Sequence, residues 1–170
     1  MLVHIGGVNG NDMVNGEGVS VSLFTQGCPH HCYNCFNPES WDYKGGIEID
    51  DLDLCNDICE KMKANGIERN LSILGGEPLA PKNLALTRKV INYVLENVEY
   101  KPHIYLWTGY TLAELQERAK NELPIRDILM KTYCLIEGRY IDEERDLTLK
   151  LRGSRNQNLI YHPSDFIKNF

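Results

Sequence analysis

Three of the six cysteines lie within eight consecutive positions, in the segment Cys28-Pro29-His30-His31-Cys32-Tyr33-Asn34-Cys35. Iron–sulfur clusters are held by cysteine thiolates that a loop of this kind brings together. A cubane has four irons, so three thiolates leave one iron without a protein ligand and open to a small molecule. The spacing therefore predicts a 4Fe–4S cluster ligated by Cys28, Cys32 and Cys35.

A structural zinc site is the alternative for this loop. Tetrahedral zinc takes four protein ligands, and His30 or His31 could supply the fourth. The spacing favours the iron–sulfur cluster, and we interpret both histidines as solvated loop imidazoles rather than ligands.

The remaining cysteines and the two tryptophans fit structural roles. Cys55 and Cys59 are four residues apart on one face of an expected helix, and Cys134 lies in an expected strand, so we expect three buried core thiols. Trp41 and Trp107 are interpreted as packing residues.

A second polar segment, Gly75-Gly76-Glu77-Pro78, follows a short apolar run about forty residues after the cysteine loop. Glycines allow a ligand to approach the backbone closely, and Glu77 supplies a charge-assisted hydrogen-bond acceptor. A β-branched residue at Gly76 is therefore expected to block a small-molecule cosubstrate while sparing the iron.

Strands and helices alternate along the chain, so that polar loops follow strands. The patterns predict a helix over residues 50–65, a second over 84–95, and a third that starts at the capping box of Thr111 and Glu114. Strands are predicted over residues 19–25, 71–74, 104–107 and 132–136. Such alternation indicates an α/β fold with parallel pairing and with the functional loops at the carboxyl ends of the strands. The tail after Gly138 shows no clear periodicity.

The length of 170 residues suits one domain spanning 1–170. It falls well short of the roughly 250 residues of a complete eight-unit barrel, so we expect a partial (β/α) barrel with a mainly parallel sheet. The net charge of −6 gives no general attraction to nucleic acid or to an anionic membrane. The N-terminus lacks the basic region and the long apolar region of a signal peptide, and no stretch approaches the roughly 20 apolar residues of a membrane span. A cytoplasmic location is therefore expected.

The cysteine loop resembles the Cys-x3-Cys-x-aromatic-Cys signature of the radical S-adenosylmethionine superfamily, with Asn34 at the usual aromatic position. The 75–78 segment looks like the second motif of that superfamily. The resemblance narrows to the activating proteins of anaerobic ribonucleoside-triphosphate reductases on five ordered segments: Val14-Asn15-Gly16-Glu17-Gly18, Phe36-Asn37-Pro38-Glu39-Ser40-Trp41, Trp107-Thr108-Gly109-Tyr110, Glu137-Gly138-Arg139-Tyr140 and Leu151-Arg152-Gly153-Ser154-Arg155-Asn156-Gln157. Glu17 and Arg155 depart from the family pattern, which usually has Pro and Ser there.

The resemblance implies a partial barrel of the radical S-adenosylmethionine type. It also implies that S-adenosylmethionine contacts Asn34, Cys35, Phe36 and Gly76 and binds the open iron of the cluster. In this family, reductive cleavage yields a 5′-deoxyadenosyl radical, which takes a hydrogen from a glycine of the large reductase subunit. A low-potential donor such as flavodoxin supplies the electron. No catalytic side chain is assigned, and the roles of Arg139, Arg152 and Asn156 stay open.

Two other functions remain as alternatives. One is an enzyme of the same superfamily that activates another glycyl-radical enzyme or acts on a small molecule. The other is a zinc-stabilised interaction module. The polar tail from Glu137 to Gln157 is interpreted as a docking segment for the reductase, because Arg139, Arg145, Arg152 and Arg155 give it cations for a partner surface. A merely solvated tail is the alternative for this segment.

Overall fold

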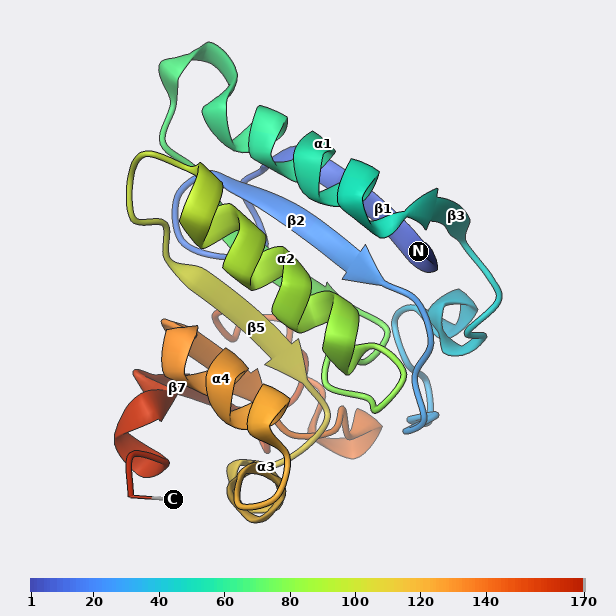
Figure 1. The fold of residues 1–170 in the computed structure, drawn as a ribbon. Helices are drawn as coiled ribbons and strands as arrows, with labels where there is room; N and C mark the ends of the chain where they lie inside the picture. Colours follow the sequence, from blue (N-terminus) through green and yellow to red (C-terminus); the bar gives the residue numbers. More distant parts are fainter. Residues whose placement is uncertain (170) are drawn as a thin grey trace.

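The computed structural model describes residues 1–169, and its strands all belong to one seven-stranded sheet (Figure 1). In chain order the strands are β1 (Leu2–Asp12), β2 (Ser20–Thr25), β3 (Ile47–Asp50), β4 (Asn70–Gly75), β5 (Ile104–Thr108), β6 (Cys134–Glu137) and β7 (Asn158–Tyr161). The helices are α1 (Asp51–Lys63), α2 (Leu84–Asn97), α3 (Leu112–Ala119) and α4 (Leu123–Lys131).

The centre of the sheet is parallel, as the alternation of strands and helices predicts. The strand order is β3-β1-β2-β4-β5-β6-β7, and the pairs β2–β4, β4–β5 and β5–β6 are parallel. Their registers place Thr25 opposite Gly75 and Thr108 opposite Glu137. The carboxyl ends of the four parallel strands β2, β4, β5 and β6 therefore lie at the same end of the sheet, and the loops that follow them gather there.

The outer parts of the sheet differ from the expectation. β1 pairs antiparallel with β2 and β3, and β7 pairs antiparallel with β6, so the sheet is mixed rather than mainly parallel. β3 and β7 are its two edges, and the sheet is open. The partial barrel that the chain length suggested is thus not confirmed. The antiparallel strands occupy both edges, where a barrel would continue with further parallel units.

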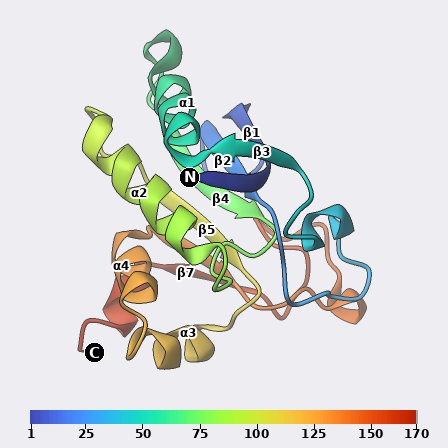
Figure 2. The same ribbon diagram turned by 45° about the vertical axis from the view of Figure 1, so that its right-hand side comes forward.

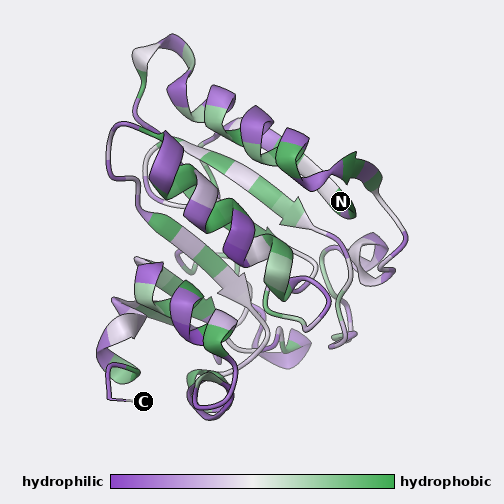
Figure 3. Ribbon diagram, in the orientation of Figure 1, coloured by the Kyte–Doolittle hydropathy of each residue, from purple (hydrophilic) through white to green (hydrophobic). Residues whose placement is uncertain are grey.

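Three helices form a layer on one face of the sheet. In Figures 1 and 2, α1, α2 and α4 cover this face, whereas the loop after β2 and the polar tail lie beyond the strand ends and behind the sheet. Figure 3 shows the hydrophobic residues of α1 and α2 in stripes, with hydrophilic residues between them. Leu54, Ile58, Val90 and Ile91 from these stripes are fully buried in the main core. Burial of this apolar face holds the helices against the sheet.

The predicted capping box and the predicted burial of three cysteines are confirmed. The Asp50 side chain accepts hydrogen bonds from the amides of Leu52 and Asp53 at the start of α1, and the capping box of Thr111 and Glu114 begins α3. Cys55, Cys59 and Cys134 are free and buried. Within residues 1–169, no helix is long and apolar enough to cross a membrane.

Candidate iron–sulfur site

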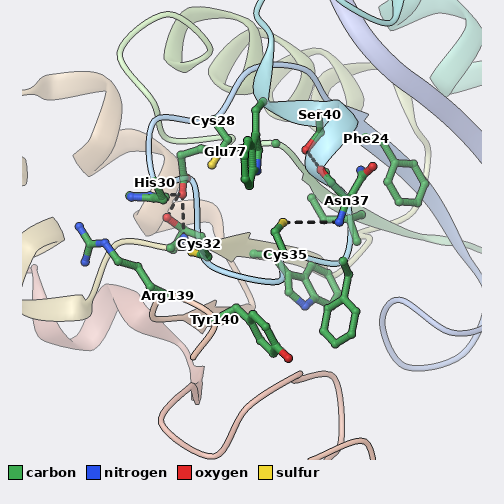
Figure 4. Close-up of a pocket in the computed structure, with 18 of the residues that line it drawn as sticks. Phe24, Cys28, His30, Cys32, Cys35, Asn37, Ser40, Glu77, Arg139 and Tyr140 are labelled. Atoms are coloured by element: carbon green, nitrogen blue, oxygen red, sulfur yellow. Dashed lines mark hydrogen bonds and ion pairs between the residues drawn. The ribbon is translucent and has the colours of Figure 1, made fainter. Parts of the chain in front are cut away.

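A pocket of about 370 Å³ lies at the carboxyl ends of the parallel strands. Its wall takes residues from the cysteine loop after β2, the turn after β4, the end of β5 with the residue that follows it, and the start of the tail after β6. Figure 4 shows that these side chains point into one shared space. The parallel centre of the fold thus brings together segments that are far apart in the sequence.

All three cysteines of the loop, Cys28, Cys32 and Cys35, line this pocket and are free of disulfides. They stand at separate positions around it (Figure 4). In the part of the chain that the structure describes, no three His, Cys, Asp or Glu side chains are placed to hold a single metal ion. A cubane is larger than an ion, and its thiolate ligands bind different irons. Three soft thiol donors spread around one pocket fit such a cluster.

Two of these thiols sit in surroundings that disfavour the thiolate. Burial raises the pKa of Cys28 to about 11. Burial also raises the pKa of Cys32. Since metals bind the thiolate, loading iron onto these residues must release protons. The sulfur of Cys35 accepts a hydrogen bond from the backbone amide of Asn37 at 3.4 Å.

The cysteine loop is braced by the residues that follow it. The amide of Gly27 donates to the Ser40 carbonyl at 2.7 Å, and the amide of Cys28 donates to the Trp41 carbonyl at 3.2 Å. The ring of His31 stacks on Trp41 with centroids 4.7 Å apart. The Phe36–Trp41 segment therefore fixes the position of Cys28. Trp41 packs as expected, while its ring also forms part of the pocket wall.

Glu77 is placed differently from the sequence interpretation. Its side chain is only 1% exposed, and its carboxylate accepts four hydrogen bonds from the protein. The donors are the amides of Leu79 and Gly109, the hydroxyl of Thr108 and the ring of His30. These bonds occupy both carboxylate oxygens, so Glu77 is not free to accept a bond from a ligand in this structure.

His30 also differs from the expectation of a solvated imidazole. Its side chain is 6% exposed, its Nε2 lies 2.8 Å from Oε2 of Glu77, and its ring meets Tyr110 edge-on at 4.6 Å. The imidazole is buried because the turns after β4 and β5 close around it. No spacing pattern in the sequence pairs His30 with a residue 47 positions away.

The four positions expected to contact S-adenosylmethionine do not all face the pocket. Cys35, Phe36 and Gly76 line it. The exposed Asn34 does not, and its side chain donates to Asp142 at 3.0 Å. A Cβ atom on Gly76 would lie 2.5 Å from the carbonyl oxygen of Gly27. The close approach that requires glycine at position 76 is therefore to the backbone of the cysteine loop.

The tail folds back onto the site instead of extending freely into solvent. Arg139 lines the pocket and pairs with both carboxylate oxygens of Glu114 at 3.1 Å. The Asn156 amide donates to the carbonyl of Arg139 at 2.7 Å, and Arg152 donates to the carbonyl of Gln157 at 3.2 Å. Asn156 and Arg152 thus shape the tail. Tyr140, which sequence reasoning did not single out, lines the pocket and packs on Phe36 at 4.8 Å.

Comparison with known proteins identifies an iron–sulfur domain in this chain. Residues 14–160 match the family model described as a 4Fe-4S single cluster domain. The anaerobic ribonucleoside-triphosphate reductase-activating protein of Haemophilus influenzae is 37% identical over 147 residues, which cover 86% of this chain and 90% of that protein. The protein of the same name from Pasteurella multocida is 38% identical over 151 residues, covering 88% and 91%.

A relative from a virus shows the same pattern. The activating protein of that name from Enterobacteria phage T4 is 31% identical over 150 residues, which are 87% of each chain. The family-model match runs through the cysteine loop, the parallel strands and most of the tail. The chain therefore belongs to the family of anaerobic ribonucleoside-triphosphate reductase-activating proteins and carries their 4Fe-4S single cluster domain.

Proposed function

We propose that this protein is an activase that cleaves S-adenosylmethionine reductively and leaves a glycyl radical on the large subunit of an anaerobic ribonucleoside-triphosphate reductase. One observation carries the proposal. Three free cysteines and the turn that follows β4 line the same pocket at the carboxyl ends of the parallel strands. Family membership supplies the reaction class, because the relatives are named as activators of that reductase.

Cys28, Cys32 and Cys35 are the residues that we propose as ligands. A 4Fe–4S cluster bound there supplies a low-potential electron and an open coordination position for S-adenosylmethionine. Around it, Phe36 and Tyr140 give the pocket an aromatic wall, and Gly76 lines the pocket beside the cysteine loop. These residues bind and orient the cosubstrate and exclude water from part of the site.

The pocket wall holds partly exposed side chains, so the site is not closed by this chain alone. Phe36 lines the pocket and is 57% exposed. We infer that the glycine-bearing segment of the reductase covers the pocket during the reaction, which places the target hydrogen near the cosubstrate and shields the radical from water. A low-potential donor such as flavodoxin is proposed on the strength of the family resemblance.

The test is electron paramagnetic resonance on the purified, iron-loaded protein. Reduced protein, S-adenosylmethionine and the cognate large subunit are mixed anaerobically, and a glycyl doublet is expected. Cys32→Ala should abolish the doublet, whereas Cys134→Ala, at a buried cysteine outside the pocket, should retain it. If S-adenosylmethionine is cleaved to 5′-deoxyadenosine and no doublet forms, the reductase is not the substrate. If no cleavage occurs with a full iron load, the proposed chemistry is wrong.

A further inference from the structure

A buried side-chain hydrogen bond joins the cysteine loop to the turn after β4, in addition to the backbone bond from the Glu77 amide to the Gly27 carbonyl at 2.8 Å. His30 lies between the first two cysteines of the loop, and Glu77 lies in the turn. Their side chains are 6% and 1% exposed, and the atoms Nε2 and Oε2 are 2.8 Å apart. The segment with the proposed cluster ligands is thereby tied to the segment proposed to receive S-adenosylmethionine (Figure 4).

Glu77 extends this connection to the end of β5. Its Oε1 accepts from the Leu79 amide at 2.9 Å and from the Thr108 hydroxyl at 2.8 Å. Its Oε2 accepts from the Gly109 amide at 2.7 Å in addition to His30. Removing one donor would leave a buried charged acceptor underbonded, and such a group costs more than the bond itself is worth. The carboxylate therefore depends on His30 to keep its position.

The imidazole has little freedom to take another position. Its ring meets Tyr110 edge-on, with centroids 4.6 Å apart. A Cβ atom on Gly109 would lie 2.4 Å from Cδ2 of the same ring. The turn after β5 is thus shaped around His30, and the ring fills the space that the glycine leaves.

We propose that His30 is a positioning residue: through Glu77, it fixes the 75–78 turn against the cysteine loop, so that S-adenosylmethionine meets the cluster in one geometry. His30 is not itself a ligand in this proposal. The part that concerns S-adenosylmethionine rests on the proposed function. The part that concerns the position of the turn rests only on the hydrogen bonds and packing of this chain.

Four variants separate the hydrogen bond from ring volume and from general effects on the loop. His30→Phe keeps a ring beside Tyr110 and loses the donor. His30→Gln places an amide nitrogen near the position of Nε2, and His30→Asn carries the same amide one methylene short of Glu77. His31→Phe is the matched control, because the neighbouring ring stacks on Trp41 and makes no bond to Glu77.

The first measurement is amide hydrogen exchange on the iron-free proteins. Exchange at Leu79 and Gly109, whose amides bond to Glu77, is expected to accelerate roughly tenfold or more in His30→Phe and His30→Asn. It should stay within about threefold of wild type in His30→Gln and His31→Phe. This measurement needs neither iron nor S-adenosylmethionine, so it tests the positioning role even if the proposed function fails.

The second measurement compares iron content with cosubstrate affinity in the reconstituted proteins. His30→Phe and His30→Asn should keep the wild-type iron load, and their Kd for S-adenosylmethionine should rise roughly ten- to a hundredfold, the effect of one charge-assisted hydrogen bond. The change that S-adenosylmethionine causes in the resonance spectrum of the reduced cluster reports the affinity. His30→Gln should restore it to within about threefold.

Three results would overturn the proposal. The first is unchanged exchange at Leu79 and Gly109 in both His30→Phe and His30→Asn. The second is a wild-type Kd in those variants with a full iron load. The third is equal loss of affinity in His30→Gln and His30→Asn, because the proposal requires the donor that only the longer amide can present. Failure of the wild-type protein to bind S-adenosylmethionine would instead count against the proposed function.

Discussion

Gly76→Ala tests how tightly the turn after β4 packs against the cysteine loop. The added Cβ would lie 2.5 Å from the carbonyl oxygen of Gly27 and 3.0 Å from its carbonyl carbon and its nitrogen. Backbone atoms cannot rotate away as the end of a side chain can, so the turn must shift. The shift would also weaken the bond from the Glu77 amide to the Gly27 carbonyl, now 2.8 Å long. Overpacking of this kind costs about 1–3 kcal/mol, and the lost hydrogen bond adds about 1 kcal/mol.

Thermal unfolding of the iron-free protein measures this cost. For a chain of this size, a loss of about 2–4 kcal/mol corresponds to a fall in Tm of roughly 5–15 °C. Gly10→Ala is the control, because the nearest atoms to its Cβ belong to the flexible Lys61 side chain, and its Tm should stay within about 2 °C of wild type. Gly27 precedes Cys28, so Gly76→Ala should also reduce the iron load, contrary to the expectation from sequence that iron is spared. A wild-type Tm together with a wild-type iron load would refute the packing argument.

Two further predictions concern the ligands and the helix layer. Anaerobic reconstitution should give about four irons per chain. Replacement by Ala should abolish the cluster at Cys28, Cys32 or Cys35 and should leave it intact at Cys55, Cys59 or Cys134. Loss of the cluster in any of the last three variants would contradict the ligand assignment. Asp127 on α4 is partly buried, which raises its pKa, but hydrogen bonds from Arg88, Lys131 and Asn92 outweigh burial and lower the pKa to about 2. A carboxyl group whose pKa is lowered in the folded state stabilises the fold at pH values above its pKa in the unfolded chain. This stabilisation is lost as the pH falls through the folded-state pKa. Asp127→Asn should therefore lower the free energy of unfolding by about 1–2 kcal/mol at pH 7. In urea titrations, the difference between variant and wild type should shrink as the pH falls from about 4 to about 2. A difference that does not change with pH would contradict this argument.

The sequence predicts the centre of the fold well and its edges poorly. Parallel strands such as β4 and β5 are mostly apolar runs that end at glycine or threonine, and α1 carries a clear apolar stripe with an aspartate cap. β1 contains three of the chain's glycines and pairs irregularly with β2, so its period of two is broken. β7 has four residues in a polar tail, and none of them is buried. Short or interrupted strands of this kind take their structure from the neighbour they pair with, which local pattern cannot show.

The site divides in the same way. The cysteine loop and the turn after β4 are predictable, because ligand type and spacing are local properties of the sequence. The bond from His30 to Glu77 is not predictable, because it depends on how closely two loops meet after the sheet has formed. The Glu77 side chain illustrates the difference. Its residue type suits a ligand contact, yet four donors from the protein already surround it, and only the assembled structure reveals them.

Three motifs that are far apart in the sequence, those containing Gly76, Gly109 and Gly153, pack against the cysteine loop in the same way. Each contributes a glycine whose missing side chain makes room for the cysteine loop. A Cβ on Gly76 would meet the backbone of Gly27, one on Gly109 would meet the ring of His30, and one on Gly153 would lie 2.7 Å from the ring of Phe36. These three contacts fall before, within and just after the cysteine segment. The turns after β4 and β5 and the polar tail are therefore shaped around that loop, so three motifs that lie far apart in the sequence meet at one site.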